Sequence, residues 1–161
     1  MRREARGARH EGEKRSVQSR SSQDLPSRLV PRASRLSIIV PTLDEAAGIV
    51  AFLEALQPLR ARSVEIVLAD GGSSDGTVAA ASVLVDRVVS AWRGRASQMN
   101  SGAGVAAGDV LLFLHADCTL PGNADHSILD GLAASRRRWG RFDVRLSGVP
   151  IMLRVVERAM N

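Results

Sequence analysis

The stretch Val64-Glu-Ile-Val-Leu-Ala-Asp70, followed by Gly71-Gly-Ser-Ser-Asp-Gly-Thr77, decides the fold class of this chain. Its first part is apolar at nearly every position, which indicates a strand that is buried on both faces. Its second part is a Gly/Ser/Asp loop that leads into a short Ala-rich helix from Thr77. A strand, a loop and a helix in this order are typical of a βαβ unit in a parallel sheet.

Three further apolar runs repeat this pattern along the chain: Leu36–Val40, which Pro41 stops, then Asp86–Ala91 and Val110–Leu114. A helix is expected from Asp44 to about Gln57, with Thr42 or Asp44 as its cap and Pro58 at its end. Residues 94–107 predict a weaker, glycine-containing helix. The sequence therefore predicts a Rossmann-like three-layer α/β fold, with mostly parallel strands and flanking helices.

The positive charge of the chain lies at its amino end. Residues 1–35 hold ten of the 22 basic residues but only four of the 17 acids, so they account for the net charge of +5. We expect a disordered basic extension over 1–35 and one domain over 36–161. A tether to anionic lipid is the alternative role for the extension, and its acids weaken that interpretation. The rest of the chain is nearly neutral, which argues against nucleic-acid binding.

Acidic side chains follow three of the predicted strands. Asp44 and Glu45 follow the first, Asp70 and Asp75 the second, and Asp117 the fourth, two residues after His115. Ligands of open parallel sheets bind beyond the carboxyl ends of the strands, so these acids should converge on the binding crevice. An anionic ligand there needs a divalent cation, and hard oxygen ligands suit Mg²⁺ or Mn²⁺. A diphosphate donor with a metal is the simplest interpretation.

Two other motif matches fail on their context. Gly71 to Thr77 has the glycine spacing of a P-loop, but Thr77 stands where that motif requires a lysine. Residues 102–107 match a dinucleotide fingerprint, yet they precede a strand instead of following one. We therefore expect neither a P-loop nor a dinucleotide-binding turn.

Three segments in register resemble the family 2 glycosyltransferases of the GT-A fold: Ser37-Ile-Ile-Val-Pro-Thr-Leu-Asp-Glu45, Ala69-Asp-Gly-Gly-Ser-Ser-Asp-Gly-Thr77 and Leu114-His-Ala-Asp117. Gly94-Arg-Ala-Ser-Gln-Met-Asn100 and Trp139-Gly-Arg-Phe-Asp-Val144 are similar to a bacterial subgroup of that family. The subgroup is associated with cell-wall, lipid-linked or carotenoid glycosylation. The resemblance covers about residues 36–145.

The resemblance implies a role for each matching position, with a UDP-sugar as the donor. It places Asp70 against the uracil ring and Asp117 on the metal ion, as the last acid of a D-x-D motif whose first acid is replaced by His115. The remaining positions would surround the base, the ribose or the rest of the donor: Pro41, Thr42, Glu45, Arg95, Asn100 and His115.

Several candidates also have a purely structural interpretation. Asp70 can cap its own turn through an Asx bond, and Asp75 is more typical of a turn or helix cap than of a ligand. Asp117 is a loop acid and Arg95 a surface arginine under the same interpretation. The lone Cys118 allows no intramolecular disulfide, has no paired base and is expected to be inert.

We therefore predict an enzyme that transfers a sugar, with inversion, to a hydroxyl of a lipid, carotenoid or cell-envelope acceptor. Family members extend further and carry their general base beyond the part matched here, and Asp143 does not match that base. The domain is accordingly expected to be incomplete at its carboxyl end. The alternative is a non-catalytic nucleotide-sugar-binding fragment, and a metal-dependent nucleotidyltransferase is a weaker third. We expect a cytoplasmic location, peripheral at the inner face of the membrane if the acceptor is a lipid.

Overall fold

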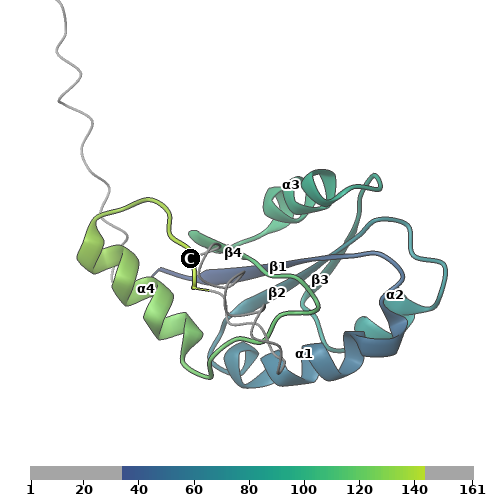
Figure 1. The fold of residues 1–161 in the computed structure, drawn as a ribbon, viewed down its shortest axis with the longest axis horizontal. Coiled ribbons are helices and arrows are strands. Elements are labelled where there is room, and N and C mark those ends of the chain that lie inside the picture. The colour runs from purple at the N-terminus through teal and green to yellow at the C-terminus, as the bar shows by residue number, and fades with distance from the viewer. Residues whose placement is uncertain (1–33, 144–161) are drawn as a thin grey trace, which may run out of the picture.

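The computed structural model describes residues 34–143, which alternate strands and helices along the chain (Figure 1). The elements follow one another in a simple βα order, with a helix after every strand. Their bounds are β1 Leu36–Thr42, α1 Ala46–Arg60, β2 Glu65–Asp70, α2 Thr77–Ala81, β3 Arg87–Ser90, α3 Arg95–Val105, β4 Val110–Phe113 and α4 Ala124–Ser135.

The described strands form one parallel four-stranded sheet in the order β3-β2-β1-β4. β1 lies at the centre, with Thr42 beside Asp70 of β2 and Ile39 beside Phe113 of β4. In Figure 1, α3 covers one face of the sheet, and α1 and α2 lie on the other. The predicted three-layer α/β fold is thereby confirmed.

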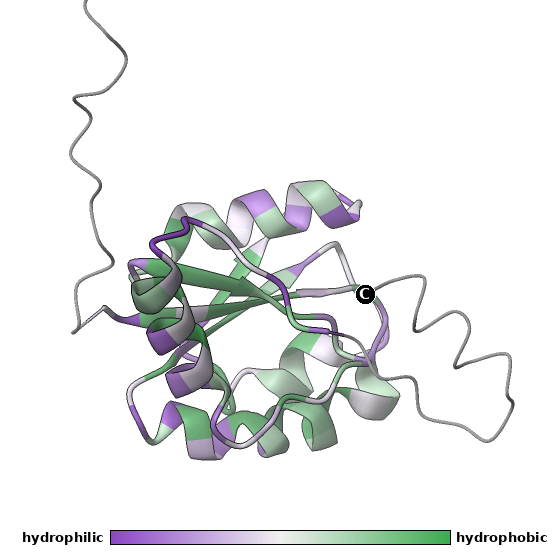
Figure 2. Cartoon of the chain, turned by 60° about the vertical axis from the view of Figure 1, so that its left-hand side comes forward, coloured by the Kyte–Doolittle hydropathy of each residue, from purple (hydrophilic) through white to green (hydrophobic). Residues whose placement is uncertain are grey.

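The two faces of the sheet carry cores of different size. The larger core packs α1 and α4 against one face, and the buried side chains of Ile38, Leu53 and Ile66 lie within it. The smaller core consists of Ile39, Val67 and Ala69, with Val89 and Ala106 packed against it. Figure 2 shows the strands as the most apolar part of the cartoon. A rigid central pair, β1 and β2, therefore positions the loops that follow it.

β1 continues through Pro41, where the sequence predicts a stop. Ile39 accepts a hydrogen bond from Leu114 N on the β4 side, whereas Thr42 accepts one from Gly71 N on the β2 side. The main-chain N–H and C=O groups of successive residues point to alternate sides of a strand, so the nitrogen of Pro41 faces the β4 side. Pairing with β4 has ended by that point, and the missing N–H of proline therefore removes no ladder bond.

The boundaries of α1 also differ from the prediction. The helix begins at Ala46, and neither Thr42 nor Asp44 caps it; instead, the carboxylate of Asp75 accepts from Ala46 N at 2.9 Å. Pro58 lies inside the helix, two residues before its last residue, Arg60. Ala61 N still donates to Gln57 O, so the helical hydrogen bonding resumes after the proline. A proline so close to the terminus removes one bond without ending the helix.

The edge strands are less buried than their apolar sequences suggest. Leu111 and Phe113 of β4 are 38% and 44% exposed, and Val88 of β3 is 41% exposed. Leu111 and Phe113 lie on the same face of the sheet as Ile39. Helix α3 packs on this face, but it covers the other strands and leaves β4 largely uncovered. The prediction that both faces of each strand are buried is therefore confirmed for β1 and β2 and wrong for β3 and β4.

The predicted extension over 1–35 lies outside the described residues, except for its last two. Arg35 donates from its guanidinium to Ala107 O and from its main chain to Asp109, so this residue is joined to the domain that the sequence predicts from residue 36. Residues 141–143, at the end of the described part, form no regular secondary structure. No helix within 34–143 combines the length and hydropathy that a bilayer crossing needs.

Candidate functional site

The loops after β1, β2 and β4 meet at one edge of the sheet, here called the carboxyl edge (residues 42–46, 70–77 and 114–118). All strands are parallel, and β1 lies between β2 and β4. β4 ends opposite Ile39, so Leu114–Asp117 runs on beside the last residues of β1. The topology thus brings the three predicted acidic segments to a single edge.

Asp70 ends β2 and shapes the turn that follows. Its side chain accepts hydrogen bonds from Gly72 N at 3.0 Å, from Ser73 N at 3.1 and 3.2 Å, and from Ser73 Oγ at 2.5 Å. The residue is 6% exposed. The Asx-type turn that the sequence allowed is therefore present, and it holds the carboxylate in one orientation. Its predicted contact with a base stays a prediction.

A second aspartate ties the loop after β1 to the loop after β2. Asp44 adopts a left-handed conformation with φ of 54°. Its carboxylate accepts from Ser74 N at 2.8 Å, and its own N–H donates to Ser73 Oγ at 2.9 Å. The two loops therefore form one hydrogen-bonded unit at the carboxyl edge.

Asp75 completes this unit. Its carboxylate accepts from Thr77 Oγ1, from Thr77 N at 3.0 Å and from Ala46 N at 2.9 Å. These hydrogen bonds, with that from the Thr77 hydroxyl the largest, lower the pKa of Asp75. Asp75 thus serves as a helix cap, as the sequence favoured, and caps α1 as well as its own turn.

Pro41 and Thr42 lie at the end of β1 and are both buried. Thr42 is 1% exposed, and its hydroxyl oxygen has no hydrogen-bond partner among the described residues. A buried hydroxyl without a partner is uncommon in folded proteins and marks a place where a group is missing or strain is stored. The main-chain carbonyl of Thr42, by contrast, accepts hydrogen bonds from Gly71 N and from a side chain of α3.

Asp117 and His115 follow β4 in a tight turn, with Cys118 N donating to His115 O at 3.0 Å. Asp117 is exposed, and its Oδ1 accepts from Cys118 Sγ at 3.2 Å. Burial, together with the neighbouring Asp117, raises the pKa of the Cys118 thiol. A thiol held protonated is a poor nucleophile, consistent with an inert Cys118.

The oxygen ligands at this edge fit a hard divalent cation only if a bound ligand supplies part of the coordination. Within 34–143 no three acidic, histidine or cysteine side chains are grouped so that they would enclose a metal. The exposed carboxylate of Asp117 offers hard oxygens, and Mg²⁺-type ions bind through one or two carboxylates plus phosphates and water. A cation would therefore be held by Asp117 together with the phosphates of a ligand.

The remaining candidates are distributed unevenly. Glu45 is exposed at the start of α1, and Arg95 is exposed at the start of α3, near the strand ends. Asn100 lies two residues beyond Gln98, which faces the sheet, so helical geometry turns Asn100 toward solvent. The structure thus brings Glu45 and Arg95 to the carboxyl edge and does not bring Asn100 there.

Sequence reasoning missed Gln98, the buried polar side chain of α3. It is 5% exposed and donates to main-chain oxygens at the ends of both central strands. The feature of the sequence that points to such a residue is the composition of α3, which has no stripe of apolar side chains to face the sheet. Its sheet-facing side therefore had to consist of small residues, such as Gly102, and a polar one.

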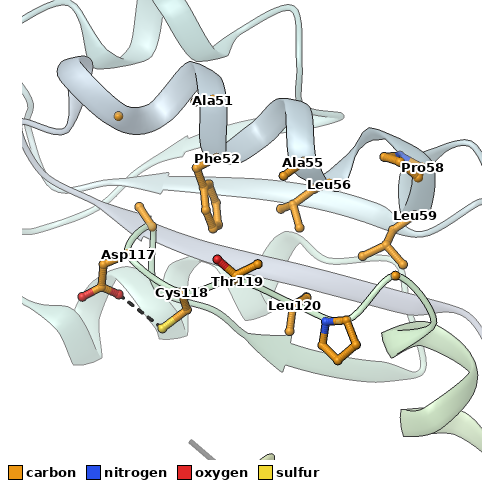
Figure 3. A pocket seen from close by; sticks show the side chains of 14 residues that line it. Ala51, Phe52, Ala55, Leu56, Pro58, Leu59, Asp117, Cys118, Thr119 and Leu120 are labelled. Carbon is orange, nitrogen blue, oxygen red and sulfur yellow. Dashed lines mark hydrogen bonds between the residues drawn. The ribbon is translucent and has the colours of Figure 1, made fainter. Parts of the chain in front are cut away.

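A cavity of about 340 Å³ lies beside the carboxyl edge, between α1 and residues 116–122 (Figure 3). Ala51, Phe52 and Ala55 form one wall. In Figure 3 Asp117 stands at one end, next to Cys118. The lining residues include one acid and no basic side chain, so the cavity is unsuited to a phosphate group on its own.

The opposite edge of the sheet is here called the amino edge (residues 34–37, 60–65, 84–87, 107–110 and 122–126). Three of its four acids are paired with arginine side chains, and the fourth, Asp109, accepts from Arg35 N. These pairs are Arg60–Asp86 at 2.9 Å, Arg62–Asp125 at 2.8 Å and Arg87–Glu65 at 2.9 Å.

Two carboxyl groups of the amino edge are held ionised by these contacts. The hydrogen bond from Arg62 lowers the pKa of Asp125 to about 2. Burial opposes ionisation of Glu65, but hydrogen bonds from Ser37, Ala107 and Arg87 outweigh it and lower its pKa. By contrast, Asp44, Asp70, Asp75 and Asp117 form no ion pair with any residue of 34–143.

Known proteins resemble this chain in sequence and in fold. PGL/p-HBAD biosynthesis glycosyltransferases of Mycobacterium bovis and Mycobacterium tuberculosis are 38% identical to it over 95 residues, which is 55% of this chain and 37% of theirs. The chain therefore matches only about a third of the length of these curated relatives.

Solved structures share the fold over a similar part of the chain. Glucosyl-3-phosphoglycerate synthase from Mycobacterium tuberculosis, in complex with Mn²⁺, UDP and glucosyl-3-phosphoglycerate, superposes with a TM-score of 0.56 at 22% identity, covering 66% of this chain and 42% of that one. A mannosyltransferase from Pyrobaculum calidifontis, in complex with GDP-Man and Mn²⁺, gives 0.50 at 27% identity, covering 64% and 32%.

The sequence model of one family matches residues 37–148, well over half of the chain, and its description is glycosyl transferase family 2. The matched range contains the four described strands, except for the first residue of β1, and the three acidic loops of the carboxyl edge. This chain belongs to the family 2 glycosyltransferases, with their GT-A fold.

Proposed function

We propose that the carboxyl edge binds a nucleoside diphosphate sugar together with a divalent cation, as the donor-binding part of an inverting glycosyltransferase. The observation that carries this proposal is the contrast between the two edges. Three of the four acids at the amino edge have arginine side chains as partners, whereas the four aspartates of the carboxyl edge have only N–H, O–H and S–H donors. Negative charge without a cationic partner favours binding of a cation, which in turn allows a diphosphate to approach.

The solved structures of similar fold support this assignment. Both carry Mn²⁺, one with UDP and the other with GDP-Man, so a nucleotide and a metal are bound together in that fold. For this chain we propose that Asp117 binds the metal ion and that the nucleobase of the donor lies near Asp70. UDP is our choice of nucleotide.

The other positions receive supporting roles. Pro41, Thr42 and Glu45 would line the base and ribose, and the unpartnered Thr42 hydroxyl is a group that a bound nucleotide or water would satisfy. Arg95, at the start of α3, would contact the donor from the other side. His115 would bond the ribose or a metal-bound water as a neutral imidazole, and Asn100 is the weakest of these assignments.

Inverting transfer requires two kinds of chemistry at the donor sugar. The bound cation would neutralise charge on the departing diphosphate. A general base must take the proton from the acceptor hydroxyl as its oxygen attacks the anomeric carbon. We assign that general base to no described residue.

The acceptor that we propose is a hydroxyl of a lipid, carotenoid or cell-envelope molecule, and the relatives' role in PGL/p-HBAD biosynthesis is in keeping with such an acceptor. A membrane-associated acceptor would place the protein at the inner face of the cell membrane.

Calorimetric titration of UDP, with and without Mn²⁺, tests the proposed binding. Wild type, Asp70→Asn and Asp117→Asn are compared with Asp130→Asn, which changes an exposed acid on α4. We expect Mn²⁺-dependent binding by wild type and Asp130→Asn, and a loss of at least about tenfold in both other variants. Absence of UDP binding by wild type in Mn²⁺ would contradict the proposal.

The rival function is a nucleotide-sugar-binding unit that does not transfer sugar by itself. The observation that favours it is that no residue within 34–143 is assigned as the general base that transfer requires. Measuring release of UDP from UDP-glucose and UDP-galactose, with an alkyl phenol as acceptor, separates the two. Acceptor-dependent UDP release supports the enzyme, and binding without release supports the rival.

A further inference from the structure

Gln98 joins three segments of the chain at the carboxyl edge. Its Nε2 donates to Thr42 O at 2.5 Å and to Ala69 O at 3.2 Å. Both partners are main-chain carbonyls, which only accept, so the donating atom must be the amide nitrogen. The side chain therefore holds α3 to the last residues of β1 and β2 at the same time.

The loop that follows β2 is part of the same contact. Thr42 O also accepts from Gly71 N at 2.9 Å, so one carbonyl receives both the turn and the glutamine. A Cβ atom at Gly71 would lie 2.8 Å from Gln98 Nε2. Only glycine lets the turn approach the amide this closely, and the Asp70 turn begins at that point.

We propose that Gln98 is a positioning residue for nucleotide binding, acting through the Thr42 carbonyl and the Asp70–Gly71 backbone. This inference rests on the proposed function, because the positioned groups are those assigned to the base and ribose. Gln98 itself needs no contact with the nucleotide. Its amide fixes the separation of the two strand ends, and with it the place of the Asp70 carboxylate relative to Thr42.

The chain contains a matched glutamine for comparison. Gln57 of α1 also donates from Nε2 to two main-chain carbonyls, Leu53 O at 2.9 Å and Leu84 O at 3.0 Å. It lies near the end of α1, at the amino edge, and is joined there to Arg60. Losing either amide removes the same kind of bond, but only Gln98 holds the carboxyl edge.

The experiment compares Gln98→Met with Gln57→Met, since methionine keeps the length of the side chain and removes the amide. Thermal unfolding and the UDP affinity in Mn²⁺ are measured for both. We expect similar reductions in Tm, but a loss of UDP affinity of about tenfold only in Gln98→Met. Equal UDP affinities in the two variants would overturn the inference, whether both match wild type or both fall together.

Gly71→Ala tests the same contact from the other side and does not depend on folding of Gln98→Met. Its Cβ meets the flexible end of Gln98, which can move aside, so the protein should fold with the amide displaced. We expect this variant also to lose about tenfold in UDP affinity. Wild-type affinity in Gly71→Ala would overturn the inference, whereas absence of binding by wild type itself would overturn the proposed function.

Discussion

The amino and carboxyl edges of the sheet use their acids in opposite ways. At the amino edge Asp86, Asp125 and Glu65 each face an arginine, and the pairs join helices and loops that are distant in sequence. At the carboxyl edge Asp44, Asp70 and Asp75 face main-chain N–H groups and hydroxyls of the loops after β1 and β2. The first arrangement closes the fold, and the second orders a set of loops while leaving their charge uncompensated. That difference, more than any single residue, is the basis on which we propose the carboxyl edge as the ligand-binding edge.

The largest effect on stability is expected from a methyl group added at the amino edge. In Gly108→Ala the new Cβ would lie 2.5 Å from Ser37 Oγ, 2.8 Å from Ser37 N and 2.9 Å from Arg35 O. Two of these atoms belong to the backbone and cannot move aside, so the free energy of unfolding should fall by about 3 kcal/mol. Urea denaturation measures this change.

Gly72→Ala is the matched change at the carboxyl edge. Nothing lies within 4 Å of its Cβ, and the cost comes only from the positive φ of 92°. A reduction of about 1 kcal/mol is expected. If Gly72→Ala proved more damaging than Gly108→Ala, the amino edge would not be the more tightly closed of the two.

Acid pH should release the Asp125–Arg62 pair. The pKa of Asp125 is lowered to about 2 in the folded protein, from an ordinary value of 3.8. A lowered pKa stabilises the folded state above the unfolded value, and this contribution is lost as the pH falls from about 4 to about 2. At pH 7 Asp125→Asn should cost about 1–2 kcal/mol, less than the full shift because Arg62 is partly exposed to solvent.

Urea denaturation of wild type and Asp125→Asn at pH 7 and near pH 2.5 checks this dependence. The two proteins should differ at neutral pH, and most of that difference should be lost near pH 2.5, which is still slightly above the folded-state pKa of Asp125. A difference that stays constant over this range would show that the charge of Asp125 does not stabilise the fold.

Much of the fold follows from local patterns, and its departures have tertiary causes. The apolar runs predict all four strands, because even the edge strands β3 and β4 keep one side against a core. Their partial exposure depends on which strands α3 covers, a matter of packing that periodicity does not contain. Pro41 fits inside β1 only because β4 ends early, and that is a property of the pairing.

The site follows the same division. The strand-end rule predicts that Asp70 and Asp117 share an edge, since it depends on topology alone. The sequence predicts Thr42 or Asp44 as the cap of α1, because both lie just before the helix. In the structure Asp75, from the loop after β2, accepts the hydrogen bond instead. Gln98 was missed because a glutamine on a helix has no distinguishing sequence environment until the helix is placed on the sheet.

An effect similar in size to that of Gly72→Ala is expected at the link between the two loops of the carboxyl edge. Thr77 Oγ1 is buried, accepts from Glu45 N at 2.8 Å and bonds the Asp75 carboxylate. Thr77→Val keeps the shape and leaves the Glu45 N–H without its acceptor, so the free energy of unfolding should fall by about 1 kcal/mol. Thermal unfolding measures it, and Ser82→Ala, at an exposed hydroxyl, serves as the control expected to change little. An equal, negligible change in both would show that the loops are not joined through Thr77.

Mapping UDP binding by NMR tests the central contrast between the edges most directly. Amide shifts of ¹⁵N-labelled protein are followed while UDP is added in the presence of Mg²⁺. The uncompensated acids of the carboxyl edge predict the largest shifts at Leu43–Glu45, Asp70–Ser73 and His115–Asp117, with Glu65, Ala107 and Asp125 nearly unchanged. Shifts confined to the amino edge, or no shifts at saturating UDP, would contradict the account.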